Sequence, residues 1–435
     1  MHDKQITFAP HGHILTNTAV WSPDSRRIVY DIRSDAEGSL FDGTRIETVD
    51  VASGEVHSVY QSRNAACCGV ATFHPRAERV VFISGPEHPD AGWSYGAARR
   101  QGVMVDMHGS DEASPLDARD LTSPFTPGAL RGGSHVHVYA PDGARVSFTY
   151  EDHILSRFVE PGPDHDINQR NVGVTVVGVP VKTSRDHPRN HDGSGFTVLV
   201  TRTTAQPARG SDQYRRAYEE GWIGAEGYRR GDGSRQRYAL AFLGDVVADD
   251  GSVHAEVFVA DLPEDLTRPG EGPLAGTETR LPWPPAGVVL RRLTRTAQRR
   301  HRGVTGVRHW VRSSPDGSQL AFLMTDHAGI SQIWTISPIG GEPRQLTSNP
   351  FAIASAFSWS PDGNRIAHVM DGDVCVTSVH DGRTRRLSNP VGDRADVPLP
   401  LACVFSPDGR RIAYQRRVKH GNDARYNQIF VLTPH

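Results

Sequence analysis

A four-residue phrase, Ser-Pro-Asp-Gly, recurs in this chain and constrains its fold more than any other feature. Full copies stand at 314–317, 360–363 and 406–409, two equal steps of 46 residues, and variants stand at 22–25 (SPDS), 140–143 (APDG) and 74–75 (HP). A short apolar run precedes each copy and an alternating run follows it, as in a β-hairpin with a Pro-Asp-Gly turn. A repeat of about 40–50 residues that is built only from strands and turns predicts a β-propeller.

The turns divide the chain into seven blades, which predicts an all-β fold and a single domain over residues 1–435. The last blade lacks its fourth strand, which in other blades reads PRQLTS or RRLTRT. The sequence Lys4-Gln5-Ile6-Thr7 is similar to these fourth strands, so we expect residues 3–8 to complete the last blade and close the ring. The first strand of the fourth blade is expected at Phe196–Val200.

Two insertions are expected in the middle of the chain, at Gly85–Gln101 and Thr183–Gln236. Long loops in a compact fold often carry function. Within the second insertion, Ser211–Trp222 has helical propensity with Asp212 as a candidate N-cap. Its Glu219-Glu220 pair is then expected on the solvated face of a short helix.

Composition excludes several classes of partner. The chain has 48 Lys and Arg against 50 Asp and Glu, so its net charge does not attract nucleic acid or an anionic membrane. No apolar run is long enough to span a bilayer, and no secretory signal is visible. The four cysteines have no CxxC spacing, which predicts free thiols in a reducing compartment and therefore a cytoplasmic protein.

Several of the 21 histidines share a register relative to the turns. Asn17, His135 and His309 each lie six residues before a turn proline, and equivalent positions in a ring surround its axis. His137 is two residues from His135, so both are expected to point the same way. Such a group predicts a divalent metal ion (manganese, zinc or calcium), and the alternative is histidines that hydrogen-bond between blades.

Arginines on the loops are candidates for binding an acidic ligand. Arg131 precedes Gly132-Gly133-Ser134, and it either binds a carboxylate bidentately or pins its own loop to a carbonyl. Arg189 is either a substrate contact or a solvated loop residue. His153, on a loop between second and third strands, and His187, on a connection between blades, are expected at the same rim.

Four segments carry a resemblance to a known family. LTNTAVWSPDS (15–25), TPGALRGGSHVHVYAPDG (126–143), AYEEGW (217–222) and GVRHWVRSSPDG (306–317) resemble the YidR-like family of uncharacterised bacterial propellers. The blade ends of the RQLT type are similar to those of TolB-type propellers. More distantly, the chain resembles oligogalacturonate lyases, which are seven-bladed propellers.

The lyase resemblance implies a histidine-rich divalent-metal site, usually manganese, and β-elimination performed by a histidine and an arginine. The implied roles on this chain are metal ligation by His135, His137 and His309, carboxylate binding by Arg131, and proton abstraction by His153 or His187. The lyases place metal-binding histidines near their C-terminal blades, whereas the last two blades here begin SAFSW and ACVF.

These observations predict a metal-dependent lyase-like enzyme that acts on a small acidic carbohydrate of the uronate type. Asn17, Arg131 and Arg189 are its expected substrate contacts. The alternative is a non-catalytic TolB-like module that binds or scaffolds a protein partner. Neither hypothesis involves nucleic acid or a membrane.

Overall fold

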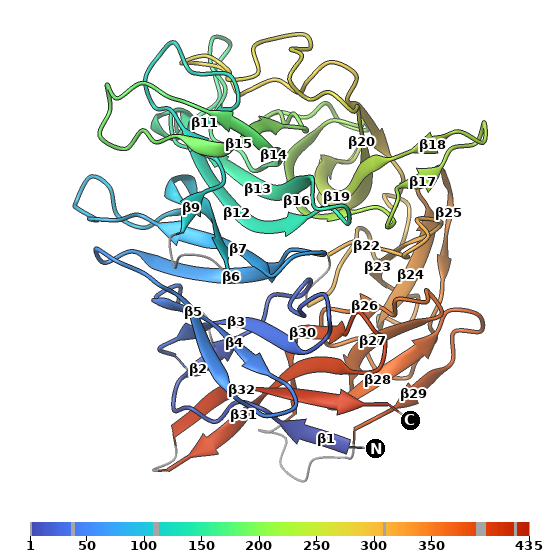
Figure 1. Ribbon diagram of the computed structural model, residues 1–435. Coiled ribbons are helices and arrows are strands. Elements are labelled where there is room, and N and C mark those ends of the chain that lie inside the picture. The colour runs from blue at the N-terminus through green and yellow to red at the C-terminus, as the bar shows by residue number, and fades with distance from the viewer. Residues whose placement is uncertain are drawn as a thin grey trace.

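Among the described residues, strands form seven antiparallel sheets of four strands each, arranged in a ring, and two further pairs of short strands (Figure 1). This is the seven-bladed β-propeller that the repeat predicts. Besides strands, the described residues contain two short 3-10 helices, η1 (Ala97–Arg99) and η2 (Leu155–Arg157), and no α-helix. The computed structural model describes residues 2–35, 40–107, 113–307, 310–388, 397–421 and 424–434.

The first three blades each run in chain order from the channel outwards. Their strands are β2 (Gly12–Ile14), β3 (Arg27–Arg33), β4 (Arg45–Asp50) and β5 (Val56–Gln61); β6 (Cys67–Phe73), β7 (Arg79–Gly85), β8 (Gln101–Asp106) and β9 (Ser114–Pro115); and β12 (Gly132–Tyr139), β13 (Arg145–Asp152), β14 (Asn171–Val181) and β15 (Gly193–Leu199). A parallel pair, β10 (Ala118–Arg119) and β11 (Ala129–Leu130), connects blades 2 and 3.

The remaining blades complete the ring, and blade 4 also carries a small hairpin between its first two strands. Their strands are β16 (Tyr214–Trp222), β19 (Tyr238–Val247), β20 (Val253–Leu262) and β21 (Val289–Arg292), with the hairpin β17 (Tyr228–Arg229) and β18 (Arg235–Gln236); β22 (Arg312–Ser313), β23 (Leu320–Thr325), β24 (Ser331–Ser337) and β25 (Gly340–Gln345); β26 (Ser358–Trp359), β27 (Arg365–Met370), β28 (Asp373–Ser378) and β29 (Thr384–Arg386); and β30 (Pro398–Phe405), β31 (Ile412–His420), β32 (Ala424–Thr433) and β1 (His2–Gln5).

The Ser-Pro-Asp-Gly phrase forms the turn between the first two strands of a blade. In blade 5, Ser314 Oγ donates to Asp316 Oδ1 at 2.6 Å and accepts from the Gln319 amide at 3.0 Å. Gly317 takes a φ of +73°, which an L side chain rarely adopts. The same serine–aspartate bond closes the turns of blades 1, 6 and 7.

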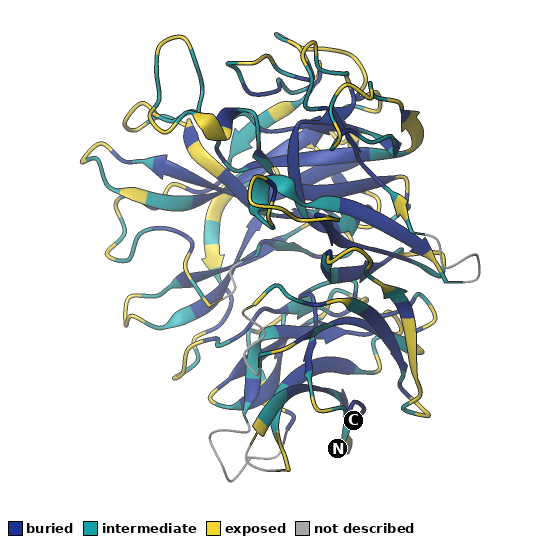
Figure 2. Ribbon diagram, turned by 90° about the vertical axis from the view of Figure 1, so that its left-hand side faces the viewer, coloured by how far each residue is buried: buried dark blue, intermediate teal, exposed yellow. Residues whose placement is uncertain are grey.

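The hydrophobic core lies between neighbouring blades rather than at one centre. Leu243 and Val257 of blade 4 pack with Leu320 and Phe322 of blade 5 in one buried cluster. A second cluster joins blades 7 and 1 in the same way. Figure 2 shows this pattern, with buried residues along the strands and exposed residues at the loop ends. Because each sheet is covered by its neighbours, stability depends on a closed ring.

The predicted closure of the ring is confirmed. β1 pairs antiparallel with β32, with His2 opposite Thr433 and Gln5 opposite Phe430, and it supplies the fourth strand of blade 7 (Figure 1). Asp3 fixes this strand with its side chain, because it accepts a hydrogen bond from Tyr414 Oη at 2.6 Å and lies 3.0 Å from Arg416 Nη2.

The helix predicted over Ser211–Trp222 is wrong, because these residues form β16, the first strand of blade 4. Two β-bulges interrupt its pairing with β19. The residues Tyr214, Ala217, Tyr218 and Gly221 are buried, and their spacing from Tyr214 by three, four and seven positions imitates a helix. Phe196–Val200 belongs to blade 3 instead, since β15 is its fourth strand.

The loops differ from the expected insertions. The expected insertion at 183–236 contains two blade strands, β15 and β16, and is therefore not one continuous loop. A long connection at 263–288, which the sequence analysis missed, joins β20 to β21. The expected loop at 86–100 is present between β7 and β8. No helix among the described residues combines the length and the hydropathy needed to cross a membrane.

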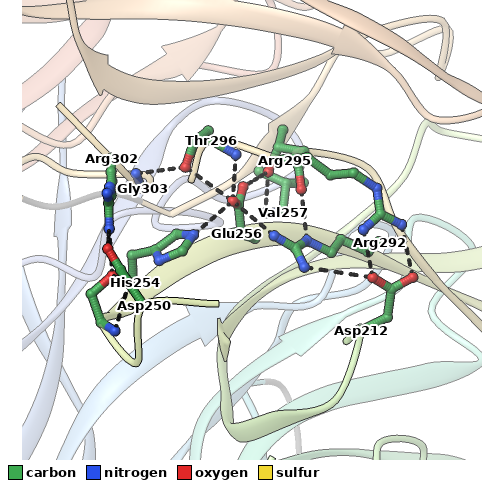
Figure 3. Close-up of polar contacts among 12 residues, drawn as sticks. Asp212, Asp250, His254, Glu256, Val257, Arg292, Arg295, Thr296, Arg302 and Gly303 are labelled. Atoms are coloured by element: carbon green, nitrogen blue, oxygen red, sulfur yellow. Dashed lines mark hydrogen bonds and ion pairs between the residues drawn. The ribbon is translucent and has the colours of Figure 1, made fainter. Parts of the chain in front are cut away.

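A buried carboxylate holds the connection between blades 4 and 5 (Figure 3). Glu256, on β20, is fully buried and accepts hydrogen bonds from His254 Nε2 at 3.1 Å and Arg292 Nη2 at 3.1 Å. The Thr296 amide donates to it at 2.6 Å, and the hydroxyl groups of Thr294 and Thr296 donate as well. The chain after β21 is thereby tied to β20.

Candidate functional site

The loop at 86–100 packs against the start of β12, beside the candidate histidines. The Ala97 carbonyl oxygen stands 2.1 Å from the place that a β-carbon at Gly133 would take. Only glycine allows this approach, which explains the Gly132-Gly133 pair before His135. The loop therefore brings its aromatic and basic residues onto the rim of blades 2 and 3.

One group of residues, the Trp93 cluster, surrounds an indole on this loop. The cluster consists of Trp93, Arg99, Arg119, His153, His187 and Arg189. The centroid of the Trp93 ring lies 4.7 Å from that of His153 and 6.3 Å from that of His187. The guanidinium carbons of Arg99, Arg189 and Arg119 lie 5.0, 5.5 and 5.8 Å from the same ring.

The Trp93 cluster keeps its imidazoles neutral. Burial, together with the positive charges of Arg99 and Arg119, lowers the pKa of His153 to about 4. Burial and the positive charge of Arg189 also lower the pKa of His187. Both rings are only partly buried and neutral, so they are potential proton acceptors.

His187 and Arg189 lie on a different loop from the one that the sequence predicted. They lie on the loop between β14 and β15 within blade 3, not on a connection between blades. Arg189 ties this loop to the loop at 86–100, because it donates to the Glu87 and His88 carbonyls at 2.6 and 3.0 Å and to Asp90 Oδ2 at 2.9 Å.

A second group, the His135 cluster, lies next to the first. It consists of Arg33, Phe41, Tyr95, Arg100, His135 and Arg170. Phe41 and Tyr95 stack with ring centroids 4.7 Å apart, and the guanidinium carbon of Arg33 lies 4.4 Å from the Phe41 centroid. Burial, followed by the charges of Arg100 and Arg170, lowers the pKa of His135 well below its usual value. The charges of Arg100, Arg170 and Arg33 thus disfavour protonation of His135, although Arg33 pairs with Asp31 and Arg170 with Glu151.

Both clusters contain buried side-chain nitrogens without a hydrogen-bond partner, as do several other places among the described residues. Trp93 Nε1, Arg100 Nε and Arg119 Nε have no hydrogen-bond partner among the described residues, and neither has His135 Nδ1. An unpaired buried donor costs about 1–3 kcal/mol, so such groups usually have partners. Four together indicate a place that suits an oxygen-rich anionic ligand.

The regular strand alternation that was expected to point His135 and His137 the same way is interrupted. Val136 between them has a φ of +58°, and the pairing with β13 shifts register at this point. His137 is consequently fully buried beside blade 2, where its Nε2 lies 2.6 Å from the position that a β-carbon at Gly102 would take. The β-bulge removes the strict alternation on which the prediction depended.

The described residues do not assemble a metal centre. No three His, Cys, Asp or Glu side chains within them stand close enough to hold one ion. His309, the third expected ligand, lies outside the described residues. The donor set that the structure describes therefore does not fit a three-ligand divalent site.

Arg131 is engaged by the protein itself. Its Nε donates to Asp152 Oδ2 at 2.8 Å, its Nη2 donates to the Arg280 carbonyl at 2.7 Å, and its Nη1 donates to the Thr277 carbonyl. The residue is only 1% exposed, so a ligand carboxylate cannot reach it. The side chain of Arg131 therefore holds loops in place by donating to backbone carbonyls, which is the second of the two roles considered for it.

Asn17 lines the central channel and contacts an arginine that the sequence analysis did not select. Arg312 Nη2 donates to Asn17 Oδ1 at 2.7 Å, from blade 5 to blade 1. Glu220, expected on a solvated helix, is fully buried nearby in β16 and accepts from Thr149 Oγ1 at 2.9 Å. Burial raises the pKa of Glu220 to about 7, although the charge of Arg312 opposes the shift.

The sequence analysis also missed Arg33, Arg100, Arg119 and Arg170. Only weak signals could have found them. Arg99-Arg100 ends an insertion that also contains Trp93 and Tyr95, which is an unusual concentration of basic and aromatic residues. The other arginines come from separate strands and loops, and only the fold brings them together.

Comparison with known proteins gives one relative over most of the chain. The chain is 46% identical to the uncharacterized protein YidR of Escherichia coli strain K12 over 415 residues, which cover 94% of each protein. A family model described as a protein of unknown function (DUF3748) matches residues 67–191. This segment contains both the loop at 86–100 and β12.

Solved structures share the fold at low identity. A manganese complex of oligogalacturonate lyase superimposes with a TM-score of 0.58 at 15% identity, covering 100% of this chain and 93% of that chain. TolB from Acinetobacter baumannii matches with a TM-score of 0.39 at 14% identity, covering 96% of this chain and 66% of that chain. At 15% identity, the likeness to the oligogalacturonate lyase structure shows the propeller fold alone.

Proposed function

The chain belongs to the family of Escherichia coli YidR, and on that premise we propose that it binds a small acidic carbohydrate of the uronate type and acts on it by β-elimination. The proposed site is the rim of blades 2 and 3, formed by the Trp93 and His135 clusters. One observation carries the proposal: buried donors without acceptors stand there among six arginines and three neutral imidazoles.

The charges of the site favour a carboxylate over a neutral sugar. Arg99 is partly exposed beside the ring of Trp93, and Arg119 lies behind it as a fully buried cation. Burial lowers the pKa of Arg119 to about 10, which still leaves it charged at neutral pH. Guanidinium groups bind carboxylates through charge-assisted hydrogen bonds, which are about twice as strong as neutral ones.

The proposed reaction removes the proton on the carbon next to the carboxylate. The electron pair left behind forms a carbon–carbon double bond as the bond from the β-carbon to the leaving oxygen breaks. The leaving oxygen keeps the electron pair of that bond and takes up a proton from water to become a hydroxyl group. His153 or His187 accepts the proton, and the arginines stabilise the charge that develops on the carboxylate. A bound carboxylate also offsets the fields of Arg99 and Arg119, so the pKa of His153 rises toward the range in which it is a better base.

The oligogalacturonate lyase structure holds manganese, and a divalent metal remains a prediction for this protein. No step above depends on it, since the described donors do not form a three-ligand set. Metal analysis of the purified protein, before and after chelator treatment, tests this prediction separately. The cytoplasmic location expected from the cysteines is part of the same proposal.

Calorimetry with trigalacturonate and with the neutral sugar galactose tests the binding step. Ultraviolet absorbance of a double bond conjugated to a carboxylate tests elimination. We expect saturable binding of the uronate, at least about tenfold weaker binding of galactose, and product formation that His153→Gln or His187→Gln abolishes. His327→Gln, which changes an exposed histidine of blade 5, is the matched control.

Equal binding of the two sugars, or no binding of either at millimolar concentration, would refute the proposed ligand. Binding that Arg99→Gln weakens, without any product from the wild-type protein, would instead support the alternative of a non-catalytic binding module.

A further inference from the structure

The central channel contains a second place with the features of a ligand site. A cavity of ≈ 380 Å³ lies where the channel reaches the turns between the first and second strands of the blades. Volumes of about 300–1,000 Å³ are typical of small-molecule sites. The turn prolines at its mouth are Pro75, Pro141, Pro315, Pro361 and Pro407.

The wall of this cavity offers apolar aromatic surface. Trp21, Trp222 and Trp359 line it, and each indole N–H donates to a backbone carbonyl of a neighbouring strand, at 3.1, 2.9 and 3.0 Å. These bonds satisfy the polar atom of each indole. The rings therefore hold the shape of the cavity and leave their carbon atoms to contact a ligand.

The inner end of the cavity is polar. Asn17 and Arg312 both line it, and Arg312 Nη2 donates to Asn17 Oδ1 at 2.7 Å. Asn17 is only 5% exposed, and its Nδ2 has no hydrogen-bond partner among the described residues. The amide orientation is consistent, because the oxygen faces the guanidinium and the donor is left for another acceptor.

The charged group that lines this end is the guanidinium of Arg312. Burial lowers the pKa of Arg312 to about 10, so the guanidinium stays charged at neutral pH. Glu220 and Glu219 favour that charge, but neither lines the cavity. Glu220 instead accepts a hydrogen bond from Thr149 on β13. A ligand in the cavity meets a guanidinium and an amide donor and no described carboxylate.

We propose that this cavity binds a small monocarboxylate with an aromatic or apolar body, whose carboxylate contacts Arg312 and Asn17 Nδ2 and whose body packs against Trp21, Trp222 and Trp359. This channel site is separate from the rim site of the proposed function. It involves different residues and a different ligand, so either site can fail in experiment without the other.

Phenylacetate, with the neutral phenylacetamide for comparison, is the probe. Intrinsic tryptophan fluorescence and calorimetry report binding, because three indoles line the cavity. We expect saturable binding of phenylacetate, at least about tenfold weaker binding of the amide, and no competition from trigalacturonate. Asn17→Asp keeps the size of the side chain and replaces the donor by a carboxylate, so it should weaken binding of phenylacetate at least about tenfold.

Arg312→Gln should abolish binding, and Arg383→Gln, on a side chain that is 88% exposed in blade 6, should leave it unchanged. Circular dichroism of each variant establishes whether it folds. If the Arg312→Gln variant does not fold, binding to the Asn17→Asp variant still decides the test. No saturable binding of phenylacetate at millimolar concentration, equal binding of the amide, or unchanged binding to a folded Asn17→Asp variant would each overturn the proposal.

Discussion

Arg131 and Asp152 form a buried ion pair, with 2.8 Å between Nε and Oδ2. Removing one member of such a pair leaves the other charged and without water, so Arg131→Ala should lower the free energy of unfolding by about 3–5 kcal/mol. Urea unfolding measures this change. Arg383→Ala, on an exposed side chain, should change it by less than about 0.5 kcal/mol. A fully stable Arg131→Ala variant that loses uronate binding would return Arg131 to the role of a ligand contact.

Glu220 should make stability depend on pH. Burial raises the pKa of this carboxyl to about 7 in the folded protein, above its value in the unfolded chain. Its contribution is therefore fully present at pH 4 and is lost as the pH rises through 7. Relative to Glu220→Gln, the wild type should lose on the order of 3 kcal/mol between pH 4 and pH 8, as measured by urea unfolding. Parallel profiles for the two proteins would contradict this, and Glu342→Gln, an exposed change, is the control.

Glu256 should act in the opposite direction. Burial alone raises its pKa, but hydrogen bonds from His254, Thr294 and Thr296 outweigh burial and lower the pKa below the ordinary value. Its stabilisation is then present at neutral pH and is lost as the pH falls through the folded pKa. Glu256→Gln should cost about 2–4 kcal/mol at pH 7 and remove part of the acid lability, which thermal unfolding between pH 3 and 7 measures. If the variant is as acid-labile as the wild type, Glu256 is not the group responsible.

Closure of the ring depends on β1, so loss of this strand should be costly. Deleting residues 1–8 should lower the melting temperature sharply, because it opens the edge of β32. Asp3→Ala removes the contacts to Tyr414 and Arg416 and should cost about 1–3 kcal/mol. Asp265→Ala, an exposed change outside blade 7, is the control. Unchanged melting of the truncated protein would mean that blade 7 does not need its fourth strand.

Much of the fold could be predicted because its signals are local. The serine–aspartate turn depends on four adjacent residues. The sequence of Lys4-Gln5-Ile6-Thr7 resembles those of the fourth strands of other blades. β16 could not be predicted, because its two bulges give Tyr214, Ala217 and Tyr218 the spacing of a helix.

Less of the site could be predicted, since its positions depend on irregular backbone and on contacts between distant segments. The left-handed Val136 separates His135 from His137, and no pattern in the sequence marks that residue. Arg119 joins the Trp93 cluster only because the loop at 86–100 packs closely on Gly133. His153 and His187 both lie beside Trp93. The prediction placed His187 on a connection between blades, whereas it lies on the loop between β14 and β15.

The pairing of β1 with β32 also has a consequence for synthesis on the ribosome. β1 is the first described strand to be made, and its only partner strand is the last. Blades 1 to 6 can form as they emerge, because each is continuous in the chain, but the final blade must wait for translation to reach its end. Throughout that interval β1 lacks its partner strand, so synthesis of β32 is the step that allows the described ring to close.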